Sequence, residues 1–151
     1  MKVNVLFYFG TNWVGRIIKF FEGKGDNPTH TGIFMFDSLL EALDAGFVKS
    51  PVDEYANSRT KIVSVEVPNI ADAEAEAKRL LYTPYGWSDC VNGGIYDTTG
   101  VMLPGDGEIT VNCSEAVTRI LRAGGVDVLP GVYADCVTPA DLLKALEVMA
   151  A

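Results

Sequence analysis

Hydrophobic residues that alternate with polar ones, or that cluster with β-branched ones, predict strands in the first half of the chain. Residues 3–9 (VNVLFYF) and 61–68 (KIVSVEVP) have this composition, and a further strand begins near His30 in THTGIFMF. Residues 39–45 (LLEALDA) fit either a short helix or a strand. A tight turn at residues 37–38 favours the strand, which then forms a hairpin with the strand before it.

Apolar residues that recur at helical spacing predict helices, and the predicted helices carry end signals. Asparagine or threonine stands at several helix starts, and Gly124 with Gly125 follows one helix. The segment between the hairpin and Pro51 is interpreted as a loop, and residues 85–107, rich in glycine and aspartate, stay unassigned. The predicted helices span residues 11–21, 70–82, 112–123 and 138–150.

This mixture of strands and helices predicts an α+β fold made of a single domain over residues 1–151. Hydrophobic residues make up 48% and charged residues 21%, which is typical of a folded soluble protein. The formal net charge of -8 disfavours nucleic acid and anionic membrane surfaces as partners. No stretch approaches the roughly 20 apolar residues of a membrane span, so we expect no stable membrane insertion.

The cysteines and the N-terminal segment favour a cytoplasmic, reducing environment. The 3 cysteines, Cys90, Cys113 and Cys136, cannot all pair within one chain, and none lies close to another in the sequence. Residues 1–10 contain one lysine and an apolar run. They lack the length and the small-residue cleavage site of a signal peptide, so we interpret them as a strand.

The segment Asn112-Cys113-Ser114-Glu115 predicts a reactive cysteine. Asn112 is a good N-cap, and Glu115 stands three residues later, as in a capping box. Cys113 then occupies the first helical position, where unpaired N–H groups and the helix dipole favour a thiolate, the nucleophilic form of the side chain. The same pattern also fits a small buried residue at a helix start. The other two cysteines lack this setting and are interpreted as structural.

His30 is the only histidine, so a cysteine nucleophile that needs an imidazole base must use it. It lies where a polar loop meets a strand, a common place for catalytic groups. A third polar group orients the imidazole in such sites, and Glu41 is the candidate because it is the one acid in the run LLEAL. If that run pairs with the preceding strand, Glu41 can face the same side as His30. A glutamate that merely faces solvent fits the pattern as well.

The order of these motifs resembles the permuted NlpC-type papain-like cysteine hydrolases of the YiiX/YebB kind. In that family a histidine at a strand start comes first, an acid-containing strand follows, and the cysteine helix comes late. The matching positions cover most of the chain in the expected order: residues 30–33, Glu41 with Ala42, Gly46 and Val48, Pro84 with Tyr85, residues 112–117 and residues 138–142.

The resemblance implies a circularly permuted papain-like fold, in which an antiparallel sheet packs with helices. It implies Cys113 as the nucleophile, His30 as the base and Glu41 as the orienting group. Tyr85 matches a tyrosine near the nucleophile that helps to bind the oxyanion or the substrate. The implied reaction is acyl transfer from a small peptide, amide or ester substrate, with no cofactor and no metal. Gly86 stands where the family has a polar residue, and the chain is short, so the substrate stays open.

Other functions fit parts of the sequence. Three cysteines and one histidine are a possible zinc-binding set, but no two cysteines have the close spacing of zinc ligands. A lipid-directed acyltransferase or thioesterase has a similar permuted site, and a binding or structural protein can keep the fold without activity. A small hydrolase of cell-wall peptides would suit a bacterial or phage protein. The sequence sets neither the host nor the oligomeric state.

Overall fold

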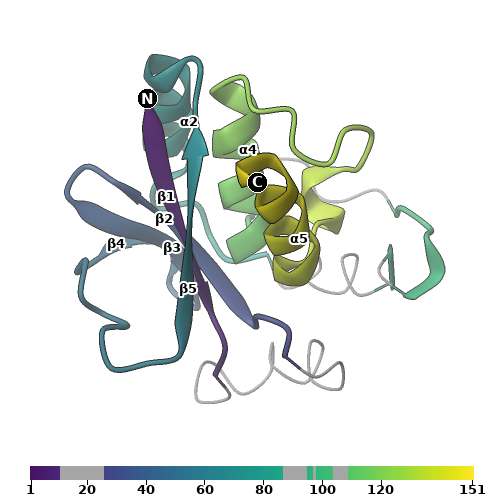
Figure 1. The fold of residues 1–151 in the computed structure, drawn as a ribbon, viewed down its shortest axis with the longest axis horizontal. Coiled ribbons are helices and arrows are strands. Elements are labelled where there is room, and N and C mark those ends of the chain that lie inside the picture. The colour runs from purple at the N-terminus through teal and green to yellow at the C-terminus, as the bar shows by residue number, and fades with distance from the viewer. Residues whose placement is uncertain (11–25, 87–94, 97, 104–108) are drawn as a thin grey trace.

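A five-stranded antiparallel sheet forms the centre of the fold, and helices pack against it (Figure 1). The computed structural model describes residues 1–10, 26–86, 95–96, 98–103 and 109–151. Neighbouring strands follow the order β4-β3-β2-β1-β5, which confirms the predicted α+β class. The strands are β1 (Lys2–Tyr8), β2 (His30–Met35), β3 (Ser38–Leu43), β4 (Gly46–Ser50) and β5 (Thr60–Glu66).

The predicted hairpin of β2 and β3 is confirmed, with its turn one residue earlier than expected. Phe36 and Asp37 form the turn, and their φ angles are 54° and 55°. Two consecutive residues with positive φ are the geometry of a type I′ turn, whose twist matches that of paired strands. Met35 therefore pairs directly with Ser38. Ser38, which the sequence placed in the turn, is the first residue of β3.

The sequence predicted a loop where β4 lies, and this interpretation was wrong. The five residues of β4 pair antiparallel with β3. Phe47 is fully buried, and its N–H and C=O bond to the backbones of Thr83 and Tyr82. So short a strand with a single fully buried large side chain shows little alternation, and its backbone pairing decides its structure.

The helices begin where capping residues predict. Asn69, Asn112 and Thr138 each accept a hydrogen bond from the backbone N–H three residues later. Three predicted helices are thereby confirmed. They are α2 (Ile70–Leu80), α4 (Cys113–Ala123) and α5 (Pro139–Ala150), and a short 3-10 helix, η1 (Ala134–Cys136), precedes α5.

Two predicted segments lie wholly or partly outside the described residues. The helix predicted at residues 11–21 lies outside the described residues. Of the unassigned segment 85–107, only residues 85–86, 95–96 and 98–103 are described.

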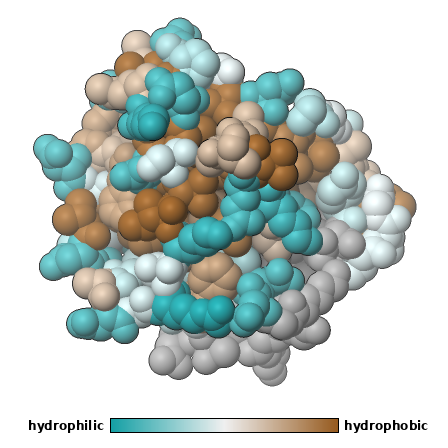
Figure 2. All heavy atoms as spheres, in the orientation of Figure 1, coloured by the Kyte–Doolittle hydropathy of each residue, from teal (hydrophilic) through white to brown (hydrophobic). Residues whose placement is uncertain are grey.

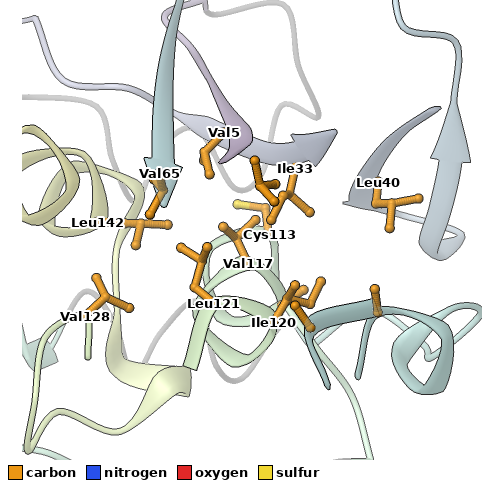
Figure 3. Close-up of a cluster of buried hydrophobic side chains, with 14 of the residues drawn as sticks. Val5, Ile33, Leu40, Val65, Cys113, Val117, Ile120, Leu121, Val128 and Leu142 are labelled. Atoms are coloured by element: carbon orange, nitrogen blue, oxygen red, sulfur yellow. The ribbon is translucent and has the colours of Figure 1, made fainter. Parts of the chain in front are cut away.

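The main hydrophobic core lies between the sheet and the helices. α4 is its central helix, because eight of its 11 residues are buried. Figure 3 shows side chains of α4 directed toward those of the central strands. The labelled core residues are Cys113, Val117, Ile120 and Leu121 from α4, and Val5, Ile33, Leu40 and Val65 from the sheet, with Val128 and Leu142 beside them.

A smaller cluster lies on the opposite face of the sheet. Leu6, Tyr8 and Leu39 pack there against Tyr55. Tyr55 belongs to the loop 51–59, which joins β4 to β5, and every other residue of that loop is exposed. Tyr55 is therefore the one side chain of this loop that is buried against the sheet.

Apolar side chains also reach the surface, between hydrophilic ones, on the face shown in Figure 2. α5 illustrates how they arise: it buries Leu142 and Leu146 against the core but exposes Val148 and Met149 near its end. None of the helices in the described ranges combines the length and the apolar character needed to cross a membrane.

Candidate active site

Cys113 is the first residue of α4, as the sequence predicts. Asn112 accepts a hydrogen bond from the Glu115 N–H at 2.8 Å, and the Glu115 carboxylate accepts one from the Asn112 N–H at 3.3 Å. Both halves of the predicted capping box are therefore present. The Ser114 hydroxyl donates to the Val137 carbonyl at 2.6 Å. This bond ties the start of α4 to the segment before α5 and so fixes the position of Cys113.

His30 and Glu41 form a buried pair between β2 and β3. Gly32 is the direct partner of Glu41, so His30, two residues along the same face, is a diagonal neighbour of Glu41. The Nε2 atom of His30 lies 2.7 Å from Oε2 of Glu41, and the two side chains are 0% and 1% exposed. The expected placement of Glu41 beside His30 is confirmed, whereas its catalytic role stays a prediction.

Gly32 provides the space that Glu41 uses to reach His30. A β-carbon at position 32 would lie 2.9 Å from the carbonyl oxygen of Leu40 and 3.4 Å from the β-carbon of Glu41. The first of these distances is too short for non-bonded atoms, so β2 and β3 would have to separate. The absence of a side chain at position 32 therefore lets the carboxylate lean along the sheet toward the imidazole.

Tyr55 is a residue of the candidate site that the sequence analysis missed. Its hydroxyl donates to Oε2 of Glu41 at 2.6 Å, the same oxygen that lies against His30. Its ring centroid lies 5.9 Å from that of His30. Tyr55 stands in PVDEYANSR, a polar stretch typical of a surface loop. The only signal in the sequence is one aromatic residue within that stretch.

Two neighbours keep His30 protonated in spite of its burial. Burial lowers the pKa of His30, but the hydrogen bonds and charges of Cys113 and Glu41 raise it from 6.5 to about 9. The imidazole is therefore positively charged at neutral pH. Since Nε2 faces Glu41, the second ring nitrogen, Nδ1, is the atom that can exchange a proton with the sulfur of Cys113.

Glu41 stays ionised for the complementary reason. Burial raises the pKa of Glu41, but the hydrogen bond and the charge of His30, together with the hydroxyl groups of Ser50 and Tyr55, lower it below its ordinary value of 4.5. At neutral pH the site therefore holds a buried carboxylate and a buried imidazolium beside the sulfur of Cys113.

Tyr85 lies beside the segment that leads into α4. Tyr85 and Val111 form an isolated parallel bridge, in which the Val111 N–H donates to Pro84 at 3.0 Å and the Gly86 N–H donates to Val111 at 2.9 Å. Tyr85 is buried and belongs to the main core. This pairing brings Tyr85 alongside a residue two positions before Cys113. Its part in binding an oxyanion or a substrate stays a prediction.

Of the other two cysteines, the structure describes only Cys136. Cys136 is fully buried in η1, where its sulfur lies 3.9 Å from the carbonyl oxygen of Leu103. This packing agrees with its interpretation as a structural residue. Cys90 lies outside the described residues. Within the described part of the chain, no three histidine, cysteine or acidic side chains gather as metal ligands would.

Comparisons with known proteins leave the family open. A scan against protein-family models and a search of the curated proteins both gave no match. The functional interpretation therefore rests on the geometry of the site and on the order of its motifs.

The charge of His30 can be measured directly, because the chain has a single histidine. We expect its imidazole signals in NMR spectra to titrate near pH 9. The pKa of His30 is higher in the folded protein than in the unfolded chain, so the protonated ring stabilises the folded state. This stabilisation is complete below about pH 6.5 and is lost as pH rises through about 9. The free energy of unfolding, from urea denaturation, should fall over the same interval. Titration of His30 near pH 6.5 would contradict the buried charged pair.

A side chain at position 32 should separate β3 from β2 and displace the Glu41 carboxylate. We expect Gly32→Ala to lower the free energy of unfolding by about 1–3 kcal/mol, as overpacking does, and to lower the pKa of His30. Denaturation and NMR titration measure the two effects. Gly131→Ala is the control: its φ of 80° strains an alanine, but no atom lies within 4 Å of the added carbon. It should cost stability without moving the pKa of His30. An unchanged His30 titration in Gly32→Ala would show that the glycine does not position Glu41.

Proposed function

We propose that this protein is a cysteine hydrolase that acts through Cys113, His30 and Glu41. One observation carries the proposal: a fully buried imidazole is bonded to a carboxylate and also interacts with a cysteine at the first turn of a helix. A thiol, an imidazole and an orienting carboxylate in contact are the groups that acyl transfer by a cysteine requires.

The charge state of His30 suits this chemistry. Its pKa of about 9 means that the ring holds its proton at neutral pH, with the sulfur of Cys113 as a neighbour. An imidazolium beside the sulfur favours the thiolate, which is the nucleophilic form of cysteine. The N–H groups at the start of α4 favour the same negative charge.

The proposed reaction has two halves. The Cys113 thiolate attacks the carbonyl carbon of the substrate, and N–H groups at the start of α4 stabilise the oxyanion. His30 gives its Nδ1 proton to the leaving group as the bond to that group breaks, which leaves a thioester on Cys113. His30 then takes a proton from water, the hydroxide attacks the thioester, and the acid product leaves. The thiolate and the imidazolium are thereby restored.

The order of the elements supports a circularly permuted papain-like fold. The strand with the histidine, β2, and the strand with the acid, β3, both precede the cysteine helix α4. In papain itself the cysteine comes first and the histidine follows far downstream. The antiparallel sheet packed against α4 agrees with the architecture that the sequence resemblance implies.

We propose a peptide, amide or ester as the substrate, with cell-wall peptides as the first group to test. The net charge of -8 opposes binding to anionic lipid, so a lipid is a less favoured substrate than a peptide, amide or ester. Tyr85 contributes to the oxyanion or substrate contacts in this proposal, because its bridge to Val111 keeps it near the start of α4.

Cys113 should be the most reactive thiol of the three. A small reagent such as iodoacetamide is needed, because the side chain is only 2% exposed. At neutral pH we expect mass spectrometry to find residue 113 modified before residues 90 and 136. Labelling of Cys113 should slow in His30→Gln, since the imidazolium that stabilises the thiolate is gone. Faster labelling of another cysteine in the folded protein would refute the nucleophile.

Glu41→Gln should lower turnover by about 10- to 100-fold, and Cys113→Ala should abolish it, because the cysteine forms the bond and Glu41 only holds the base. The substrate is whichever peptide, amide or ester an acylating-probe screen identifies. Glu41 is 1% exposed, so Glu41→Gln should also lose stability, and both variants are compared well below their melting temperatures. Full activity of Glu41→Gln would show that another group orients His30.

A further inference from the structure

The loop 51–59 is exposed except for one side chain. Turns close it locally: the Glu54 N–H donates to Pro51 at 3.1 Å, and the Ser58 N–H donates to Tyr55 at 3.0 Å. Of its nine residues only Tyr55 is buried, with 8% of its surface exposed. A tyrosine that served only to anchor the loop would need a place in the apolar cluster and nothing more.

The Tyr55 side chain ends on the acid of the candidate site. Its hydroxyl donates to Oε2 of Glu41 at 2.6 Å, and the Nε2 atom of His30 lies 2.7 Å from that same oxygen. The ring packs against Tyr8, with centroids 5.1 Å apart, and lies 5.9 Å from the His30 ring. One carboxylate oxygen thus receives two donors, one from the loop and one from β2.

We propose that Tyr55 is a positioning residue of the hydrolase: its hydroxyl holds the Glu41 carboxylate in the orientation in which Oε2 also accepts the proton of His30 Nε2. This inference rests on the proposed function, since positioning has a catalytic meaning only if His30 acts on Cys113.

A glutamate side chain has several rotatable bonds, so each further donor restricts it. Without Tyr55 the carboxylate would keep only its bonds to His30 and Ser50 among the described groups, and Oε2 could move together with the ring. The short bond from Tyr55 removes this freedom, because the tyrosine ring itself packs against Tyr8 and the other sheet residues of the smaller cluster. The orientation of His30 toward Cys113 is then set by the loop as well as by β3.

The hydroxyl also keeps the proton on the correct partner. A carboxylate that already accepts a strong hydrogen bond is a weaker base, so Glu41 does not take the proton that His30 must later deliver to the leaving group. The described groups that face Glu41 are His30 from β2, the hydroxyl of Ser50 from β4 and Tyr55, while Cys113 lies beyond His30. Of the described neighbours that can donate to Glu41, Tyr55 alone belongs to a loop and not to a strand.

The test compares Tyr55→Phe with Tyr8→Phe. Both tyrosines are 8% exposed and belong to the same cluster, but only Tyr55 donates to Glu41. NMR signals of the single histidine report protonation of its partner Glu41 at acidic pH. We expect this acidic transition to move to higher pH in Tyr55→Phe and to stay at the wild-type position in Tyr8→Phe. An equal position in all three proteins would show that Tyr55 is only a packing residue. Loss of folding in Tyr55→Phe alone would show that the hydroxyl serves stability, and this too would overturn the positioning role.

Thiol labelling supplies the functional readout. The rate at which iodoacetamide modifies Cys113 should fall about tenfold in Tyr55→Phe, the scale of one lost hydrogen bond to a charged group, and should be unchanged in Tyr8→Phe. In a Glu41→Gln background, Tyr55→Phe should have no further effect, because the shared carboxylate is gone. An equal loss in both backgrounds would overturn the positioning role.

The two proposals fail in distinguishable ways. An unreactive Cys113 in the wild-type protein would refute the hydrolase, whereas the NMR titration would still decide whether Tyr55 holds Glu41. If Cys113 is reactive but neither its labelling rate nor the acidic transition of the His30 signals changes in Tyr55→Phe, the hydrolase proposal stands and the role of Tyr55 is refuted.

Discussion

The hydrogen bond between His30 and Glu41 is the interaction on which the rest of the site depends. Both side chains are withdrawn from water, and a buried charge is tolerated only where an opposite charge and hydrogen bonds replace its hydration. Glu41 supplies that compensation on one side of the ring, and Cys113 is the second group that keeps the ring protonated. Without them burial would leave His30 neutral, and a neutral imidazole is too weak an acid to protonate a leaving group.

Several separate parts of the fold serve this one pair. The type I′ turn sets the register of β2 and β3, and Gly32 opens the space across which Glu41 reaches His30. The capping box and the bond from Ser114 to Val137 fix the start of α4, where Cys113 stands. The loop 51–59 adds Tyr55 from the face of the sheet that lies opposite the main core. Elements from four regions of the chain therefore converge on two charged side chains.

Local signals in the sequence were sufficient for part of this arrangement. β-branched runs predicted β1, β2 and β5, and cap residues predicted α2, α4 and α5, because these elements carry their own end signals and apolar faces. The pairing of His30 with Glu41 followed once LLEAL was interpreted as a strand beside β2. The chain has one histidine, so no other partner for a nucleophile competed with it.

The features that the sequence did not predict depend on contacts between distant segments. β4 has one fully buried large side chain and is held by backbone bonds to residues 82–83, which no local pattern reveals. Tyr55 stands in a polar loop, and its importance arises only because the fold places that loop over Glu41. The helix predicted at residues 11–21 and Cys90 lie outside the described residues, so those predictions stay open.

The same charges stabilise the fold and provide the proposed chemistry, so stability and the proposed activity depend on pH over the same range. The stabilisation from His30 is lost as pH rises through about 9, because its folded pKa is raised. The stabilisation from Glu41 is lost as pH falls through its folded pKa, because that pKa is lowered. Between these limits both partners are charged, and only there does the imidazolium exist beside its carboxylate. A substitution that widens the range of stability by removing this pair would therefore remove the proton donor that the hydrolase needs.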